Sequence, residues 1–412
     1  MTTIEQLKLA KDATNILRLA TTEQKNNFLH KLSDLLLQNI SEILVENKKD
    51  LDAAVDITKP MKKRLELTEQ GIGAIAKGVR EVVGQEDPVG KIVNTWKRPN
   101  GLTIGKMRVP IGVIVFVFES RPNVIVDAAA LCVKSGNVLI ARGGKEAQNS
   151  NNILEKIIQE ALESVGLPKE AVQQLEDRDY SALTEVVQSY KYVDLVVPRG
   201  RAKMIKAIKD AARVPVIAHE RGLCHLYIDK AADKKKAIDI SINAKVSNPS
   251  VCNSIETILV HKDATDKILP DLISKFIENG VEVRGDERVC SYSNKCVKAT
   301  EEDWNTEYLD LIISIKVVDS YKEAVEHITR YSSGLTDSIV TEDKNLGDKF
   351  LRDINSASVL VNASNRLTDG GVFGLGAELG ISTASIHMKG PMGIEDLTVT
   401  KYIVVGDGQI RE

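Results

Sequence analysis

Continuous apolar runs rich in β-branched residues alternate with segments of helical length along most of this chain. The run "GVIVFVFES" at 112–120 is typical of a strand buried on both faces, and 126–136 predicts a helix that ends at Gly136. The alternation continues with strands expected at 138–144, 193–200, 214–219 and 224–229 and helices at 151–175 and 201–212. This pattern predicts βαβ units around a parallel sheet.

A second alternating block begins near residue 235. It predicts strands at 255–261, 281–284, 310–318, 336–341 and 358–361, and helices at 235–246, 264–278, 320–330 and 343–353. The predicted fold class is therefore α/β, with two α/β domains built on parallel sheets. We expect the first domain over 1–220, the second over 221–375, and a return segment with a terminal strand over 376–412.

Two β elements lie outside the alternation. Residues 4 to about 85 have helical spacing, and 91–109 then predicts a hairpin whose turn is "RPNG", since Asn-Gly favours positive φ values. The β-branched tail at 397–406 predicts a further strand. Strands without a sheet of their own pair with each other and with another chain, so we expect a homodimer or a dimer of dimers.

Composition narrows the class of protein. The chain has 412 residues and a net charge of −3, which gives no indication of nucleic acid or a membrane surface as partner. No apolar run approaches the length that spans a bilayer, and the N-terminus does not resemble a signal peptide, so we expect a cytoplasmic protein. Five cysteines in such a chain predict reduced thiols, and neither cysteines nor histidines have metal-site spacing.

Three loops after predicted strands are basic. "ESRPN" at 119–123, "ARGGKEA" at 141–147 and "PRGRAK" at 198–203 should meet at one edge of a parallel sheet. Helix N-termini with free N–H groups, together with arginine side chains, suit phosphate. Together the loops favour a ligand with several phosphates, such as a dinucleotide with a 2′-phosphate. Each loop taken singly is equally consistent with turn glycines and solvated arginines.

Cys252 stands in "SNPSVCNSIETILVH", between a turn and an apolar strand. Most free cysteines are small buried hydrophobes, and Cys132 and Cys224 in apolar runs fit that interpretation. Backbone N–H groups in a polar turn could lower the pKa of the Cys252 thiol and receive an oxyanion. Its context leaves both interpretations open, a nucleophile or a cysteine in a loop.

Four blocks together carry a resemblance. They are the stretch from "VPIGVIVFVFESRPN" to "ARGGKEA", then "VVPRG", "SNPSVCNSIETILVH", and "GLGAELGISTASIHMKGPMGIEDLTVTKYIVVGDGQIR". They closely resemble the γ-glutamyl phosphate reductase family of the aldehyde dehydrogenase superfamily, over essentially the whole chain. The resemblance implies NADPH-dependent reduction of L-glutamyl 5-phosphate to L-glutamate 5-semialdehyde with release of phosphate, the second step of proline biosynthesis. It also implies glutamate 5-kinase as a possible partner that passes L-glutamyl 5-phosphate directly to this enzyme.

The resemblance also implies roles for particular residues. The nucleophile of the family falls on Cys252, and its "VCN" motif adds Asn253 to the catalytic set. Arg121 and the Cys252 backbone N–H are the candidate oxyanion donors. The implied contacts to NADPH or NADP⁺ come from two loops, and the residues are Arg142, Gly143, Gly144, Lys145, Pro198, Arg199 and Gly200.

One stretch departs from the wider superfamily. Hydrolytic members activate water with a Glu in a "LELGGK"-like segment, and the corresponding "AHERGLCH" places His219 at that position, with Glu220 beside it. A missing base fits phosphate as the acyl partner, because water would waste the activated acyl group. A hydrolytic or coenzyme A-acylating aldehyde dehydrogenase, and a non-catalytic nucleotide-binding scaffold, remain the alternatives.

Overall fold

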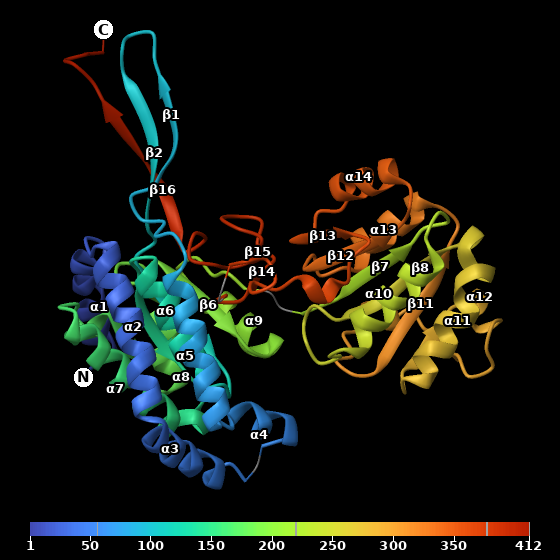
Figure 1. Cartoon of the computed structure of the whole chain (residues 1–412), viewed down its shortest axis with the longest axis horizontal. Coiled ribbons are helices and arrows are strands. Elements are labelled where there is room, and N and C mark those ends of the chain that lie inside the picture. Colours follow the sequence, from blue (N-terminus) through green and yellow to red (C-terminus); the bar gives the residue numbers. More distant parts are fainter. Residues whose placement is uncertain (56, 219–220, 376–377, 412) are drawn as a thin grey trace. The chain divides into compact units, whose positions relative to one another are not determined.

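The computed structural model describes residues 1–55, 57–218, 221–375 and 378–411, and its internal contacts divide the chain into two compact units. Unit 1 consists of 1–218, 374–380 and 392–412, and unit 2 consists of 219–373 and 381–391. Each unit contains a parallel sheet flanked by helices (Figure 1). The α/β class predicted from the sequence is therefore confirmed.

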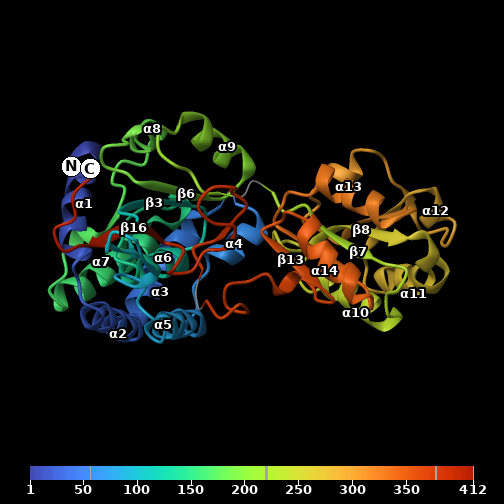
Figure 2. The same ribbon diagram turned by 90° about the horizontal axis from the view of Figure 1, so that it is seen from above.

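The sheet of unit 1 has four parallel strands in the order β5-β4-β3-β6. All six residues of β3 are buried, as its continuous apolar run predicts. Helices α6 and α7 contact one face, while α8 and α9 lie on the other face together with α1 (Figure 2). The strands are β3 (Val113–Phe118), β4 (Val138–Arg142), β5 (Val172–Gln174) and β6 (Leu195–Arg199). The helices are α1 (Thr3–Leu17), α6 (Asn123–Lys134), α7 (Gln148–Ser164), α8 (Tyr180–Gln188) and α9 (Ala202–Ala211).

The N-terminal region is helical, as its spacing predicts. Apolar side chains of α2 such as Phe28 and Leu32 are fully buried, and α2 packs against α5 and α7. A buried ion pair of 2.9 Å between Lys25 of α2 and Asp87 then fixes the segment that leads to the hairpin. The remaining helices are α2 (Thr22–Gln38), α3 (Ile40–Ala53), α4 (Lys59–Leu65) and α5 (Glu69–Val83).

The hairpin and the tail form one antiparallel sheet in the order β1 (Ile92–Lys97), β2 (Thr103–Pro110), β16 (Thr398–Val405). The tight turn is formed by 98–101, where the Gly101 N–H donates to the Arg98 carbonyl. Only Gly101 has positive φ (90°), so Asn100 does not adopt the conformation expected for both residues of the Asn-Gly pair. The loop is one residue longer than a two-residue hairpin and needs one glycine in the left-handed region.

Unit 2 has a seven-stranded sheet in the order β10-β9-β11-β8-β7-β12-β13, with every pair parallel. Two apolar clusters pack on it. One includes Leu226 and Ile258, and the other surrounds Tyr227 and Leu259 on the alternate strand positions. A short antiparallel pair, β14 (Ile381–Ser382) with β15 (Gly390–Pro391), completes the unit.

Its main strands agree with the expected ones to within two residues. They are β7 (Cys224–Ile228), β8 (Ile255–His261), β9 (Glu282–Gly285), β11 (Ile312–Val318), β12 (Thr336–Val340) and β13 (Ser358–Val361), with β10 (Val297–Lys298) unpredicted. The helices are α10 (Lys234–Val246), α11 (Thr265–Glu278), α12 (Glu287–Cys290), α13 (Tyr321–Tyr331) and α14 (Lys344–Asp353).

Three further expectations are wrong. The helix expected over 151–175 ends at Ser164, because Gly166 takes a positive φ of 75° and Pro168 follows, and β5 and α8 come after it. In 214–218 only one bridge forms, between Val216 and Val196, since Pro215 has no N–H to extend the ladder. Cys290 and Cys296 form a disulfide, which α12 and the turn after it bring together, so reduced thiols remain only at Cys132, Cys224 and Cys252.

Candidate active site

The carboxyl ends of β3, β4 and β6 bring the three basic loops together in unit 1. Val117 pairs with Arg142 on one side of β3, and Phe118 pairs with Arg199 on the other. Arg121 lies in the loop that continues from β3 into α6. The edge of the sheet predicted from the sequence as a phosphate-binding region is therefore formed by adjacent segments.

Arg142 keeps part of its hydrogen-bonding capacity. Its Nη2 donates to the Arg178 carbonyl at 3.0 Å, and its guanidinium lies 5.9 Å from the Tyr180 ring centroid. Its Nε is buried, and no acceptor for it lies within the described residues. A buried guanidinium N–H without a partner is costly, so this side chain suits an anionic ligand.

Gly143 allows α7 to approach the loop closely. A Cβ on Gly143 would lie 2.2 Å from Nδ2 of Asn151, which is fully buried. The first turn of α7 is already occupied, however, since Asp50 of α3 accepts bonds from the backbone N–H groups of Asn149 and Ser150 at 3.0 and 2.8 Å. The expectation of free helix N-termini is therefore wrong for α7.

The N-terminus of α9 is different, because its N-cap residue, Arg201, makes no side-chain capping bond within the described part of the chain. Gly200 precedes it, and a Cβ there would lie 2.6 Å from the Met204 Cε and 2.9 Å from the Glu119 Cδ. Arg201 and Glu119 form an exposed ion pair of 3.5 Å across the same two loops. The Met204 N–H already donates to the Arg201 carbonyl at 2.9 Å, so the N–H groups of Ala202 and Lys203 are the ones suited to an anion.

Ser120 has a positive φ of 43°, which is uncommon for a residue with a Cβ. It is buried, and its hydroxyl donates to the Glu146 carboxylate of the neighbouring loop. Conformations of this kind persist where the surrounding structure holds them, often beside functional groups. No pattern around "ESRPN" predicts this link between the two loops.

Cys252 and Asn253 lie in unit 2, in the loop between α10 and β8. Cys252 is partly exposed. Its carbonyl accepts a bond from the Cys224 Sγ at 3.2 Å, and the backbone of Gly222 packs directly against it. The polar turn read from the sequence is thus held from the neighbouring strand β7.

The side-chain amide of Asn253 is already hydrogen-bonded through both its nitrogen and its oxygen. Its Nδ2 donates to the Thr368 carbonyl at 2.9 Å, and its Oδ1 accepts from the Arg366 guanidinium. The side chain is 5% exposed. These contacts tie the Cys252 loop to the segment 365–368, and sequence spacing gives no sign of them.

A buried ion pair joins the two ends of the Cys252 loop. Lys245 at the end of α10 and Glu256 at the start of β8 are 2.6 Å apart, with side chains 0% and 1% exposed. Burial raises the pKa of Glu256 to about 7 and lowers the pKa of Lys245. Ser254 adds a bond from its hydroxyl to the Ala244 carbonyl at 3.2 Å.

The three free cysteines differ in their surroundings. Cys132 and Cys224 are fully buried, and burial raises the pKa of Cys132 to about 12 and that of Cys224 well above its ordinary value. Buried thiols of this kind stay protonated and unreactive. Cys252 is the partly exposed one of the three.

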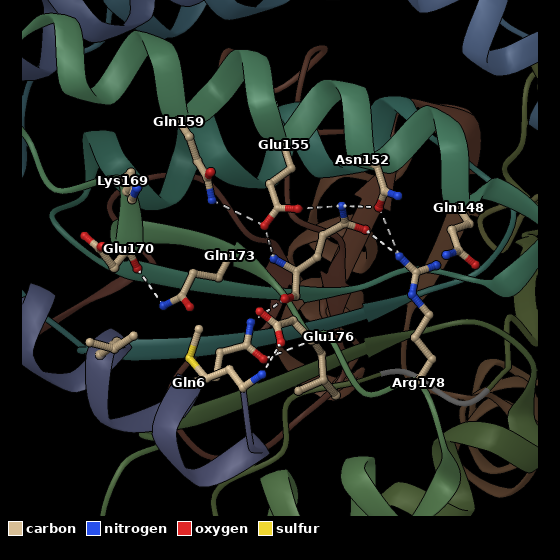
Figure 3. A pocket seen from close by; sticks show the side chains of 14 residues that line it. Gln6, Gln148, Asn152, Glu155, Gln159, Lys169, Glu170, Gln173, Glu176 and Arg178 are labelled. Atoms are coloured by element: carbon tan, nitrogen blue, oxygen red, sulfur yellow. Dashed lines mark hydrogen bonds and ion pairs between the residues drawn. The ribbon is translucent and has the colours of Figure 1, made fainter.

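A polar pocket lies elsewhere in unit 1, at the free edge of β5, with a volume of about 500 Å³ (Figure 3). There Gln159 of α7 donates to the Val172 carbonyl at 3.1 Å, and Glu155 accepts from the Gln174 N–H at 2.6 Å. Gln6 of α1 donates to the Gln174 carbonyl. These side chains satisfy the edge strand, as sheets without a further strand require.

Further results concern the position of the water-activating base, a metal site and a membrane-spanning helix. His219 and Glu220 lie outside the described residues. Over 1–55, 57–218, 221–375 and 378–411, no three His, Cys, Asp or Glu side chains are grouped to hold a metal ion, and no helix has the length and apolar composition to cross a bilayer.

Comparison with known proteins gives one consistent result. Residues 3–288 match the aldehyde dehydrogenase family. The chain is 47% identical to the γ-glutamyl phosphate reductase of Dictyoglomus thermophilum and 48% identical to that of Nautilia profundicola, over 99% of this chain and 99% and 100% of theirs. The crystal structure of the Thermotoga maritima γ-glutamyl phosphate reductase superposes with a TM-score of 0.97 at 42% identity, covering 100% of both chains. With its two parallel-sheet units and its cysteine loop, this chain belongs to the aldehyde dehydrogenase family and, within it, to the γ-glutamyl phosphate reductases.

Proposed function

We propose that this enzyme reduces L-glutamyl 5-phosphate to L-glutamate 5-semialdehyde with NADPH and releases phosphate through a thioester on Cys252. The observation that carries the proposal is the contrast among the free cysteines. Cys132 and Cys224 are buried with raised pKa values, which leaves the partly exposed Cys252 as the thiol that a substrate can meet. The family relationship supplies the substrate and the place in proline biosynthesis.

The reaction of Cys252 follows from thiol chemistry. The thiolate attacks the acyl carbon, and the tetrahedral oxyanion collapses, which breaks the bond to phosphate and leaves a thioester. The Cys252 backbone N–H and Arg121 are the proposed oxyanion donors, each worth roughly 3–4 kcal/mol when well placed. NADPH, when bound, supplies the hydride that reduces the thioester to the level of the aldehyde. Release of the aldehyde returns the Cys252 thiolate.

The residues at the sheet edge of unit 1 fit a dinucleotide phosphate. The buried Nε of Arg142 without an acceptor, and the uncapped first turn of α9 behind Gly200, are suited to phosphate oxygens. We assign Arg142 with Lys145 to the 2′-phosphate, Gly143 and Gly144 to close backbone approach, and the segment 198–200 to the remaining contacts. Because Asp50 caps α7, we place the pyrophosphate at α9 and not at α7.

Oxidation of glutamate semialdehyde by NADP⁺ tests the proposal, with and without phosphate. The reductase should give one NADPH per active site without phosphate and a steady rate after phosphate is added, and arsenate should replace phosphate. Sustained turnover without phosphate would indicate a hydrolytic enzyme, and a rate that requires coenzyme A would indicate an acylating one. A Cys252→Ala variant should bind NADPH but give no burst. That result would show that the activity of the wild type depends on this thiol, which a non-catalytic scaffold would not explain.

A further inference from the structure

Arg178 follows β5 and lies beside the loop that carries Arg142. Strands β4 and β5 are parallel neighbours, and Ala141 pairs with Gln174, so the two segments leave the sheet at the same edge. The Arg178 carbonyl accepts the bond from the Arg142 Nη2 at 3.0 Å, which joins the two segments directly. Sequence patterns place Arg178 after a long helix, so its position beside Arg142 is visible only in the fold.

Both guanidinium groups keep a buried donor that has no acceptor among the described residues. In Arg142 this donor is the Nε, and in Arg178 it is the Nη1. The Nη2 of Arg178 is held by neutral oxygens, the Asn152 Oδ1 at 3.2 Å and the Gln174 Oε1 at 3.4 Å. Neither arginine has a carboxylate as hydrogen-bond partner in the described part of the chain. Two such groups side by side are stabilised by an anion that accepts from both.

Arg178 also lines the polar pocket of about 500 Å³ beside β5, where its guanidinium group points toward Asn152 of α7 (Figure 3). Gln148 and Asn152 line the same pocket, and their amide groups can donate to an anion. Burial lowers the pKa of Arg178. The nearby Glu155 carboxylate opposes this effect, and the positive charge of Arg142 adds to it. The arrangement therefore leaves room for a ligand beside a pair of arginines that repel each other.

The proposed cofactor site determines which anion fits here. The pyrophosphate is assigned to α9, which follows β6, whereas β5 is the opposite edge strand of the order β5-β4-β3-β6. Arg178 is joined to Arg142, so the phosphate nearest to it is the one assigned to Arg142, the 2′-phosphate. A phosphate monoester carries a charge of about −1.5 to −2 at pH 7 and three acceptor oxygens, which suits two guanidinium groups better than one.

We propose that Arg178 binds the 2′-phosphate of the cofactor together with Arg142, so that two arginines from neighbouring segments distinguish NADPH from NADH. This assignment rests on the proposed function, which supplies the cofactor. It adds a specificity-determining residue outside the loop 141–147, and it accounts for both unpartnered donors with one ligand. Asn152 and Gln174 then serve to orient the Arg178 guanidinium group.

Binding without turnover tests the assignment. Isothermal titration calorimetry on the whole enzyme compares adenosine 2′,5′-bisphosphate with adenosine 5′-monophosphate, which differ only in the 2′-phosphate. The wild type should bind the bisphosphate more tightly. Arg178→Ala should reduce the ratio of the two Kd values by about 10- to 100-fold, the effect of losing hydrogen bonds to a charged group. Arg178→Lys should recover part of the ratio through its charge.

The ratio is measured within one preparation, so a partly unfolded sample, which binds both nucleotides less, cannot imitate the result. Arg178→Gln keeps most of the side-chain length and gives the same comparison if the alanine variant does not fold. Arg213→Ala is the matched control, because Arg213 is exposed and lies beyond the C-terminal end of α9. That variant should keep the wild-type ratio.

A wild-type ratio in Arg178→Ala would overturn the assignment while the proposed function stands. Equal weakening of both nucleotides would also overturn it and would leave Arg178 a structural residue of the pocket. Weaker binding of inorganic phosphate with an unchanged ratio would replace it with a separate phosphate site. A wild type that binds both nucleotides equally would refute the preference for NADPH and this assignment with it. Loss of the ratio in Arg178→Ala, together with a wild type that gives no phosphate-dependent turnover, would support the assignment and refute the proposed reaction.

Discussion

The Cα of Gly222 packs against the backbone of Cys252 so closely that a Cβ on Gly222 would lie 2.0 Å from the Cys252 carbonyl oxygen. The same Cβ would lie 2.7 Å from both the Cys252 Cα and its carbonyl carbon. The Gly222 N–H is fixed from the other side by Glu307 at 2.7 Å. A Cβ at position 222 would meet backbone atoms, so the backbone of 222 or that of Cys252 would have to shift, and we expect Gly222 to help set the position of the proposed nucleophile.

Gly222→Ala should therefore lower kcat by about 100-fold, the effect of a displacement of roughly 1 Å at a reacting group. The rate at which iodoacetamide alkylates Cys252 should change as well, while NADPH binding stays the same. Gly78→Ala is the control, because a Cβ there meets nothing within 4 Å in the middle of α5. That variant should keep full activity and gain about 1 kcal/mol of stability. Wild-type kcat and alkylation rate in Gly222→Ala would refute the positioning role.

Arg142→Ala should raise the KM for NADPH much more than the KM for NADH, because a 2′-phosphate is present only in NADPH. Arg142→Lys should recover part of the difference through its charge, without the planar fork of donors. The two KM values measured on one preparation provide the comparison. An equal rise in both would assign Arg142 to a part of the cofactor that NADPH and NADH share.

Removing one partner of the buried pair Lys245–Glu256 should lower the stability of the fold more than removing both. Lys245→Met leaves the Glu256 carboxylate buried without its cation and should cost about 3–5 kcal/mol of unfolding free energy in urea. The double variant Lys245→Met with Glu256→Leu should recover most of that loss, since no charge remains buried. If the double variant recovers stability but not kcat, the pair orients the Cys252 loop. A single variant as stable as the wild type would show that the pair is not buried in solution.

His327 should make the fold sensitive to acid. It is 5% exposed beside His225, Trp304 and Tyr331, and burial, followed by the charges of His225, Lys316 and Arg330, lowers its pKa to about 2. Between about pH 6.5 and pH 2 the unfolded chain binds a proton here that the folded chain does not, so stability falls as the pH falls. From pH 7 to pH 5 the loss should be about 2 kcal/mol.

Urea unfolding of the wild type and of His327→Phe at pH 7 and pH 5 measures the contribution of His327 to this loss of stability. The variant should lose about 2 kcal/mol less than the wild type between pH 7 and pH 5. His30→Gln, at an exposed position of α2, should show the wild-type dependence. Equal losses in wild type and His327→Phe would contradict the assignment.

The strand β16 should form part of an interface between copies of the chain. It is an edge strand, and Tyr402 and Val404 are 65% and 57% exposed on it. Tyr402→Lys should shift the protein from a dimer or dimer of dimers toward monomers in light scattering. Truncation at 397 is a poorer test, because Leu397 is buried and its carbonyl accepts a bond from Asn137. A wild-type monomer would refute the prediction.

Patterns within the sequence were enough to predict most of the architecture. The apolar runs at β3 and β8 and the amphipathic helices between strands depend on local composition and on a short-range period, so they can be read without the fold. The motifs around Cys252 and the three basic loops were also readable, because βαβ topology places such loops at one sheet edge. Gly166 and Pro168 carried the signal that ends α7, but the apolar residues after them imitate a helical period.

The tertiary structure alone decided which groups are already engaged. Asp50 occupies the N-terminus of α7 from α3, about 100 residues away, and Arg366 and Thr368 hold Asn253 from 113 and 115 residues further along the chain. The burial of Cys132 and Cys224 is of the same kind. Hydrogen bonding, desolvation and close backbone approach depend on neighbours from distant segments. The sequence determines such neighbours only through the complete fold.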